Sequence, residues 1–258
     1  NAVDKRTKPH LATYFETQKQ FYAPLQEIAE QDGSPFVDQY AVTRAVIEKL
    51  AIDDPMAKKA NPFPDGVHTN GQGGLLMAHT ILVGLKAPAL VSDAVVDAQA
   101  GTAETKHCTV EKIVAHEDGV SFERLDEALP IPLQKDWLPI LPYVNQLEDL
   151  NWYGLKVAGL ADGTYAVTID GTEVGRFTAG QLAAGVNLGN VTVGPIYDQA
   201  NKLFQAINKK NADLVHKRFR GVVMYKAESM PDWFGDLGPR IAERRAQELA
   251  SRMEKIVA

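Results

Sequence analysis

The stretch Asp65-Gly66-Val67-His68-Thr69-Asn70-Gly71-Gln72-Gly73-Gly74 runs directly into the apolar segment Leu75–Leu85. A loop rich in glycine that leads into an apolar run predicts a turn followed by a helix over about residues 72–85. A carboxylate three residues before a histidine can accept a hydrogen bond from one imidazole nitrogen and fix its tautomer. The other nitrogen then faces outward and can take a proton from a hydroxyl nucleophile. The stretch therefore predicts a general-base unit, with His68 as the base and Asp65 as its orienting partner.

A purely structural interpretation of the same loop stays open. An isolated Asp-x-x-His pattern also occurs in solvated turns, and Thr69 or Asn70 could cap the helix that follows. In that case the two side chains carry no chemistry.

The segments before this loop follow a helix, strand, helix order. Apolar residues at helical spacing predict a helix over residues 10–31, which Asp32-Gly33 ends. Pro35–Asp38 is expected to form a short buried strand, and Tyr40–Leu50 a second helix. Such a succession is typical of one arm of a parallel α/β sheet. The proline-punctuated residues 53–64 would then deliver Asp65 and His68 to the carboxyl edge of that sheet, where sites form.

The block Phe63-Pro64-Asp65-Gly66-Val67-His68, with its Gly-containing loop and Leu-rich helix, resembles the last sequence block of the SGNH (GDSL-type) hydrolases. Tyr22–Glu30, Gly33 and Phe36–Asp38 resemble the helix and strand before that block, so the resemblance covers about residues 10–90. The later segment Gly159–Leu188 is similar to the C-terminal part of a multi-domain subgroup of the family.

The resemblance has several implications for fold and activity. Residues 1–90 would form the C-terminal part of a flavodoxin-like three-layer α/β sheet, and Asp65 and His68 would belong to a Ser-His-Asp triad. The complete protein would be a serine ester hydrolase, or acylhydrolase, acting on carbohydrate acetyl esters or small carboxylic esters, and it would be exported. One departure is that Thr69 stands where the family often has proline, which concerns the loop geometry rather than the Asp-His pair.

The nucleophile of the family is missing from this sequence. The family places it in a Gly-Asp-Ser block and builds its oxyanion hole partly from a Gly-x-Asn-Asp block, and neither block occurs here. None of the five serines follows Gly-Asp; they are Ser34, Ser92, Ser121, Ser229 and Ser251. We therefore expect an N-terminal segment outside this chain to supply the serine. The alternative is a catalytically inactive binding or scaffold protein that keeps Asp65 and His68 as relics.

The remaining sequence divides into a β-rich accessory region, residues 91–190, and C-terminal helices, residues 191–258. Three alternating segments, Tyr153–Ala158, Thr164–Ile169 and Thr172–Phe177, are joined by Asp-Gly pairs and predict a three-strand meander with tight primed turns. Residues 129–142 carry four prolines and are expected to be extended. Helical patterns cover Pro195 to about Met224 and Pro239–Val257. The expected role of the β-rich region is to wall the cleft or bind substrate.

Composition and charge exclude several classes of protein. A net charge of −6 argues against binding to nucleic acid or to an anionic membrane, and no run of about 18 apolar residues predicts a transmembrane helix. Cys108 is the only cysteine, so an intrachain disulfide and a Cys-based zinc site are impossible. Five histidines have no spacing typical of metal ligands: His10, His79, His107, His116 and His216. We therefore expect no metal or cofactor.

A few residues keep a second interpretation. The basic cluster His216–Arg220 is typical of the last turns of a helix, but it could also bind an anion or a sugar acid. Trp137, Trp152 and Trp233 favour core or interface packing, although tryptophan can also stack on sugars. The acidic pairs at 117–118 and 126–127 would serve a glycosidase only if two carboxylates faced one another.

Overall fold

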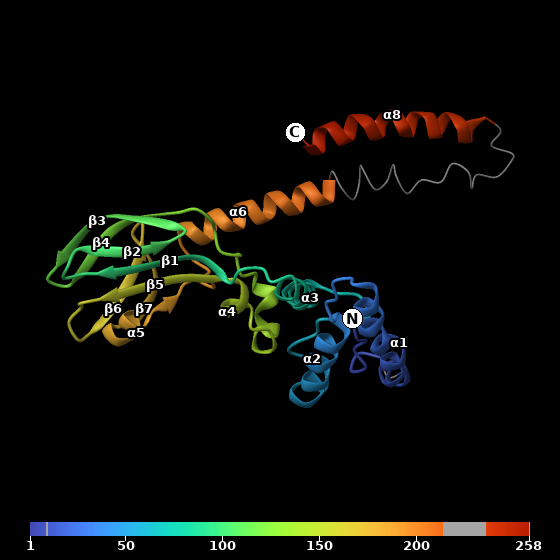
Figure 1. Cartoon of the computed structure of the whole chain (residues 1–258), viewed down its shortest axis with the longest axis horizontal. Helices are drawn as coiled ribbons and strands as arrows, with labels where there is room; N and C mark the ends of the chain where they lie inside the picture. The colour runs from blue at the N-terminus through green and yellow to red at the C-terminus, as the bar shows by residue number, and fades with distance from the viewer. Residues whose placement is uncertain (9, 214–235, 258) are drawn as a thin grey trace. The chain divides into compact units, whose positions relative to one another are not determined.

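The computed structural model describes residues 1–8, 10–213 and 236–257 (Figure 1). The chain divides into two compact units, residues 1–197 and 198–258. The first unit holds a helical part, which carries the predicted site, and a β-rich part.

Three helices build the helical part: α1 (Leu11–Asp32), α2 (Gln39–Asp53) and α3 (Gly71–Gly84). Their positions confirm the three helices expected from apolar periodicity. The Asp38 carboxylate caps α2 by accepting the N–H of Ala41, and the Asn70 side chain caps α3 by accepting the N–H of Gly73. The Asn70 cap thus fixes where the segment between α2 and α3 ends.

The expected strand at Pro35–Asp38 is wrong. These residues are extended but pair with no strand, and the described residues before Leu90 contain none. The Val37 side chain instead packs so closely on Gly84 of α3 that a Cβ there would clash with it. An extended apolar segment becomes a strand only when a neighbouring strand takes its backbone hydrogen bonds, and α3 cannot do so. The sheet expected within residues 1–90 is therefore not found among the described residues of that range.

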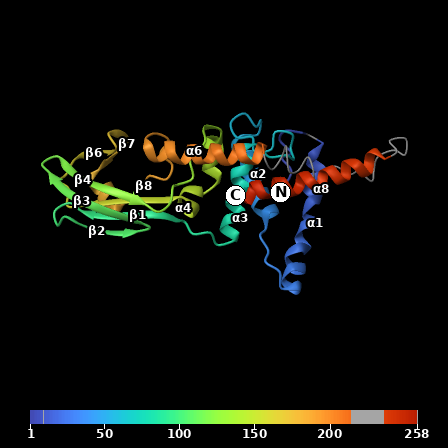
Figure 2. The ribbon, with the colours of Figure 1, turned by 90° about the horizontal axis from the view of Figure 1, so that it is seen from above.

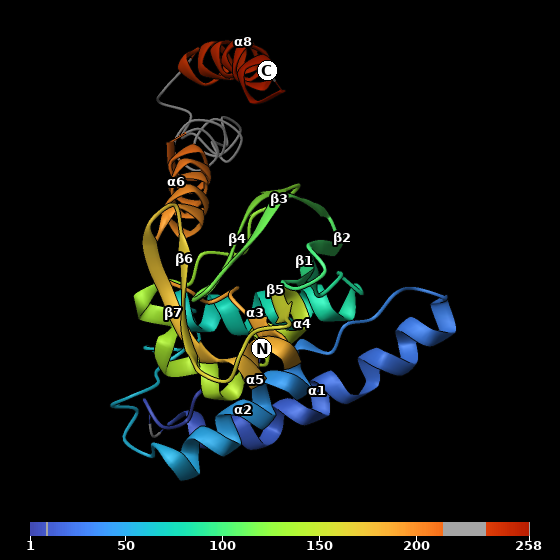
Figure 3. The ribbon, with the colours of Figure 1, turned by 90° about the vertical axis from the view of Figure 1, so that its left-hand side faces the viewer.

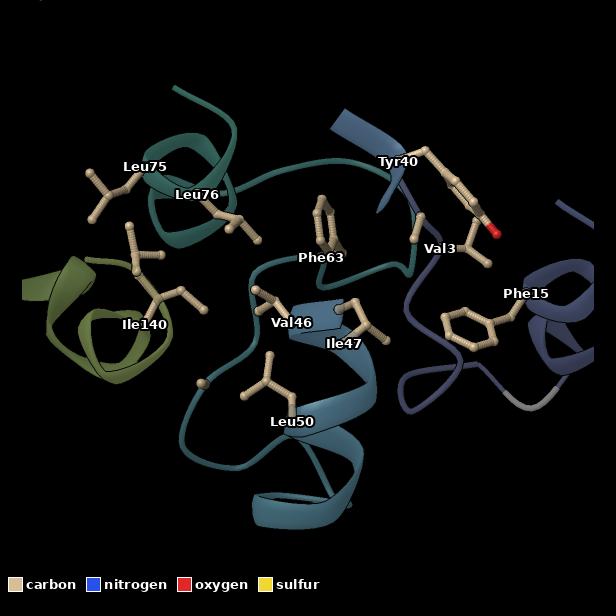
Figure 4. Packing of buried hydrophobic residues seen from close by; sticks show 13 residues of the cluster. Val3, Phe15, Tyr40, Val46, Ile47, Leu50, Phe63, Leu75, Leu76 and Ile140 are labelled. Atoms are coloured by element: carbon tan, nitrogen blue, oxygen red, sulfur yellow. The ribbon is translucent and has the colours of Figure 1, made fainter. Parts of the chain in front are cut away.

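The helical part has its own hydrophobic core (Figure 4). Figure 4 shows side chains from the N-terminal segment, all three helices, the 54–70 loop and the 3₁₀ helix η1 (Lys135–Tyr143) pointing toward one another. Phe63 lies in this core with no exposed surface. Burial of Phe63 anchors the loop only two residues before Asp65.

The β-rich part is built on a four-stranded mixed sheet, so the expected α/β class is confirmed. The sheet has the order β2 (Thr102–Lys106), β1 (Leu90–Asp97), β5 (Trp152–Ala158), β8 (Val186–Asn187). The strands β1 and β5 are parallel, whereas β2 and β8 run antiparallel to their neighbours. Alternation along β1 buries Ala94 and Val96 completely.

Two hairpins stand on this sheet: β3 (Cys108–His116) with β4 (Gly119–Asp126), and β6 (Thr164–Ile169) with β7 (Thr172–Thr178). Figure 3 shows them diverging from the strands β1 and β5. Positive φ angles of 46° at Asp170 and 78° at Gly171 confirm the primed turn between β6 and β7.

The three-strand meander is wrong. The strand β5 pairs with β1 and β8 rather than with β6, and neither Asp162 nor Gly163 has the positive φ that a primed turn requires. The Asp-Gly dipeptide permits that turn without enforcing it. Here the parallel neighbour β1 takes the hydrogen-bonding edge of β5 that a meander would have used.

The extended structure expected for residues 129–142 is only partly right. Residues 129–134 are irregular, but η1 winds Pro139 and Pro142 into a 3₁₀ helix. Prolines three residues apart suit short turns of this kind, because such turns leave some N–H groups unused. The helix η1 and the helix α4 (Gln146–Leu150) both contact α3, and α4 precedes β5 in the chain. Figure 2 shows α4 beside the end of α3.

The remaining helices are α5 (Ala179–Ala184), α6 (Pro195–Lys210) and α8 (Leu237–Val257). The second helix of the C-terminal region is therefore present as expected. The continuation of the first toward Met224, the basic cluster His216–Arg220 and Trp233 lie outside the described residues. None of the helices in the described ranges combines the length and the apolar character needed to cross a membrane.

Candidate active site

The structure brings Asp65 and His68 together. The Asp65 Oδ2 atom lies 2.7 Å from His68 Nδ1, and Asp65 Oδ1 accepts the backbone N–H groups of Val67 at 2.9 Å and His68 at 2.8 Å. A carboxylate accepts from Nδ1 only when Nδ1 carries the proton, so Nε2 of neutral His68 is the acceptor nitrogen. Within the described ranges, Nε2 has no hydrogen-bond partner. The pair thus has the orientation required of a general base.

Hydrogen bonds also control the ionisation of Asp65. The bond from the His68 ring contributes most, and the N–H groups of His68 and Val67 add to it, so the pKa of this carboxyl lies well below its usual range. Asp65 is therefore negative near neutral pH and remains able to stabilise an imidazolium ion.

The N-terminal segment packs against the loop between Asp65 and His68. Gly66 has a φ of 87°, and a Cβ on it would clash with Leu11. The Gly66 carbonyl accepts the N–H of Asp4 at 2.8 Å. Only glycine meets both the backbone conformation and the close approach. The Gly66 position thus links the site loop to residues more than fifty positions earlier.

A buried charge network fixes the base of the same loop. Arg6 and Asp4 form an ion pair at 2.7 Å with only 2% and 0% of their side chains exposed. Arg6 also donates to the carbonyl oxygens of Asp54 and Ala60. Burial raises the pKa of Asp54, but the N–H groups of Lys59, Ala60 and Lys58 outweigh it, with a smaller contribution from Arg6, and hold this pKa below its usual value. The network determines where residues 54–60 lie.

Arg6, Asp4 and Asp54 are functional supports that sequence reasoning missed. The Asp54-Pro55 dipeptide signalled a turn, but nothing in the spacing of Asp4, Arg6 and Asp54 linked the N-terminus to the loop. Their partners are mostly backbone carbonyl and N–H groups, which leave no mark on side-chain patterns.

The helix-capping interpretation of the loop applies to Asn70 rather than to Asp65 and His68. Asn70 caps α3 and donates from Nδ2 to the Asn61 carbonyl at 2.8 Å, while Gln72 accepts the N–H of Asn61 at 2.9 Å. Capping therefore accounts for Asn70. It does not account for Asp65 and His68, which make no contact with the end of the helix through these bonds.

The site is open in this chain. The side chains of His68 and Asp65 are 86% and 53% exposed, and the clefts beside α2 and between the β hairpins are lined by other residues. The expected cleft around Asp65 and His68 is therefore neither of these two.

None of the serines that the structure describes is hydrogen-bonded to His68. Ser34 donates to Asp32 at 2.6 Å in the turn after α1, and Ser92 is fully buried, where it donates to Asp126 at 2.6 Å. Ser121 is bonded to the His116 ring, and Ser251 is on α8. Ser34 is thus a residue of the turn that ends α1.

The other histidines that the structure describes are not grouped as a metal site. His79 Nε2 lies 2.9 Å from Asp149 Oδ2, which joins α3 to α4. His107 approaches Glu127 at 3.3 Å. Groups of three or more potential metal ligands are absent from the described ranges.

The helical part exposes an unusual amount of apolar surface. Tyr14, Phe21, Leu25 and Ile28 of α1 are 41–75% exposed. Their spacing of seven, four and three residues places them on one stripe of the helix. Further exposed residues lie near the other helices; they are Phe36, Ile81, Leu82 and Leu85. Large apolar patches on a protein surface mark sites that another surface covers.

No protein-family model matches the chain, and no curated protein sequence matches it. A solved structure, described as a gut microbial diltiazem-metabolizing enzyme, is similar in fold: the TM-score is 0.68 with 25% sequence identity, over 99% of this chain and 67% of that one. The similarity makes an enzymatic function plausible for this chain. About a third of the similar protein has no counterpart here.

Proposed function

We propose that this chain is part of a serine ester hydrolase of the SGNH (GDSL) type, in which His68 is the general base and Asp65 orients it. The observation that carries the proposal is the 2.7 Å contact between Asp65 Oδ2 and His68 Nδ1, which leaves Nε2 free and outward. The resemblance of residues 63–68 to the last block of that family and the fold shared with an enzyme support the proposal.

The chemistry follows from this orientation. A serine Oγ–H within reach of His68 Nε2 gives its proton to the ring as Oγ attacks the ester carbonyl. The imidazolium ion, stabilised by Asp65, then protonates the leaving alcohol as the C–O bond breaks, and an acyl-serine remains. Water repeats the sequence: His68 takes its proton, the hydroxide adds to the acyl carbon, and the serine leaves with a proton from the ring. Donors for the oxyanion complete the site.

The serine and these donors come from a segment outside residues 1–258. We propose that this segment also covers the apolar surface of α1 and α3, because an α/β hydrolase packs such helices against its central sheet. The unmatched third of the similar enzyme is long enough to contain several strands and their connections. The same segment then supplies both the missing walls of the site and the partner of the exposed stripe.

The proposed substrate is a small-molecule ester. The solved enzyme of similar fold metabolises diltiazem, which supports a small-molecule substrate. Carbohydrate acetyl esters remain the second substrate class that the family resemblance implies.

The test is hydrolysis of an activated acetyl ester by the protein extended upstream of Asn1. His68→Ala should abolish turnover, and His10→Ala, which changes an exposed histidine at the start of α1, should not. Both variants should unfold at the wild-type temperature. Wild-type turnover by folded His68→Ala would reject the assignment.

A second function is favoured by the openness of the site. An inactive protein that binds or scaffolds would need no nucleophile near His68, and none lies in the described ranges. The coding sequence upstream of Asn1 separates the two functions: Gly-Asp-Ser and Gly-x-Asn-Asp blocks support the hydrolase, and their absence supports the scaffold.

A further inference from the structure

The β-rich part contains a cleft that the proposed chemistry does not use. It lies between the hairpins β3–β4 and β6–β7, whose divergence Figure 3 shows, and its floor is formed by β5. Its volume is about 620 Å³. Small-molecule sites have volumes of about 300–1,000 Å³.

The floor of the cleft is apolar. Phe122 of β4, Leu155 of β5 and Val167 of β6 line it. Phe122 and Val167 are only partly buried, although both pack on the hydrophobic cluster of the β-rich part. A ligand that covers them removes apolar surface from water.

One end of the cleft is a rigid polar cluster of Ser92, Arg124, Asp126 and Tyr153. Arg124 Nε lies 2.9 Å from Asp126 Oδ1, Nη1 donates to the Gly154 carbonyl and Nη2 donates to Ser92. Tyr153 donates to the other oxygen of Asp126, and Arg124 stacks on its ring. These bonds use three of the five N–H groups of Arg124, so two in the described structure remain for a ligand.

The rim is acidic and hydroxylated. Glu111 and Glu123 stand directly opposite each other on β3 and β4, and both line the cleft together with Asp170. Like charges at opposed positions of a sheet destabilise it. Lys112 pairs with Glu123 at 2.7 Å but, in the described structure, no cation pairs with Glu111. Thr109 and Thr168 add hydroxyl groups to the same rim.

We propose that this cleft binds a neutral carbohydrate. An anion would meet three rim carboxylates and a guanidinium already neutralised by Asp126. A hydrocarbon would desolvate the carboxylates and give them no hydrogen bond. A sugar ring offers C–H surface to Phe122 and Val167, hydroxyl donors to Glu111 and Asp170, and hydroxyl acceptors to the spare N–H groups of Arg124. This inference concerns binding alone and does not depend on the proposed ester hydrolysis.

The experiment is an NMR titration of the full-length protein with short neutral oligosaccharides built from glucose, xylose, mannose or galactose. The His68→Ala background keeps binding separate from turnover. We expect saturable shifts for residues of β4, β5 and β6 with at least one sugar. Phe122→Ala and Glu111→Gln should each weaken binding about tenfold, the effect of one lost charge-assisted hydrogen bond or apolar contact.

Glu104→Gln is the matched control, because it removes the same charge from β2 outside the cleft and should leave the affinity unchanged. Thermal unfolding of each variant checks its fold. The proposal is overturned by the absence of saturable binding to every neutral sugar, by binding that survives both cleft variants, or by preferred binding of an alkylamine or an acidic sugar.

Discussion

The part of the chain that the structure describes contains two histidine-aspartate pairs of similar geometry, one in the loop before α3 and one between α3 and α4. Their N···O distances are 2.7 Å for His68 and Asp65 and 2.9 Å for His79 and Asp149. The first pair is local, uses Nδ1 and leaves 86% of the His68 side chain exposed. The second spans seventy residues, uses Nε2 and leaves 14% of His79 exposed.

The two pairs differ in exposure and in how far apart their residues lie in the chain, and these differences suit different roles. A pair three residues apart on one loop adds little to the tertiary fold, yet it presents an oriented acceptor nitrogen to its surroundings. A pair that joins α3 to α4 tethers two elements and offers little of its ring to a substrate. Under the proposed function, these similar distances correspond to different roles, which exposure and the choice of ring nitrogen distinguish.

The largest expected effect is on turnover. In the active, extended protein, His68→Ala should abolish ester hydrolysis because no other acceptor is oriented by Asp65. His79→Gln should leave kcat close to wild type. Steady-state kinetics with an activated acetyl ester measure both, and equal losses in the two variants would remove the distinction between the pairs.

Asp65→Asn should lower kcat by roughly a thousandfold to ten-thousandfold, because the amide no longer selects the Nδ1–H tautomer. The KM should change little, since Asp65 does not contact the substrate in this mechanism. Asp149→Asn is the matched variant in the second pair, and it should leave kcat unaltered. A kcat for Asp65→Asn near that of wild type would show that the orienting role is absent.

Arg6→Ala should destabilise the fold by about 3–5 kcal/mol, because it leaves the buried Asp4 carboxylate unpaired. Arg176→Ala breaks an exposed pair with Glu173 and should cost less than about 1 kcal/mol. Urea unfolding of both variants gives the comparison. A similar small loss for Arg6 would mean that the network beneath the site loop contributes no rigidity.

Acid should remove the contribution of Asp54. Its pKa is lower in the folded state than in the unfolded state, so the unfolded chain binds more protons as the pH falls. The stability it contributes is therefore complete above pH about 4 and is lost as the pH falls through the lower, folded-state pKa. The stability difference between wild type and Asp54→Asn should shrink over that range; a difference that grows toward low pH would reverse the sign.

A small effect on stability is expected for the second pair. His79→Gln should cost about 1 kcal/mol of stability, the net value of one partly buried hydrogen bond. A thermal unfolding series at neutral pH measures it. A loss as large as that for Arg6→Ala would make this junction, rather than the N-terminal network, the main support of α3.

Sequence patterns predicted what depends on neighbours in the chain. The three helices, the cap at Asn70, the primed turn at Asp170-Gly171 and the approach of Asp65 to His68 all involve residues a few positions apart. The strand at 35–38 and the meander through β5 failed because strand pairing depends on distant partners. Val37 packs on α3, and β5 pairs with β1; no local sequence pattern encodes either contact. The Arg6 network was missed for the same reason.

The most direct measurement is labelling with a serine-directed phosphonate, followed by mass spectrometry of the labelled peptide. Residues 1–258 alone should not react. The protein extended upstream of Asn1 should be labelled on a serine of the added segment, and His68→Ala should abolish that labelling. Covalent labelling of Ser34 or any other serine within residues 1–258, or labelling of the extended protein that is indifferent to His68→Ala, would contradict the account.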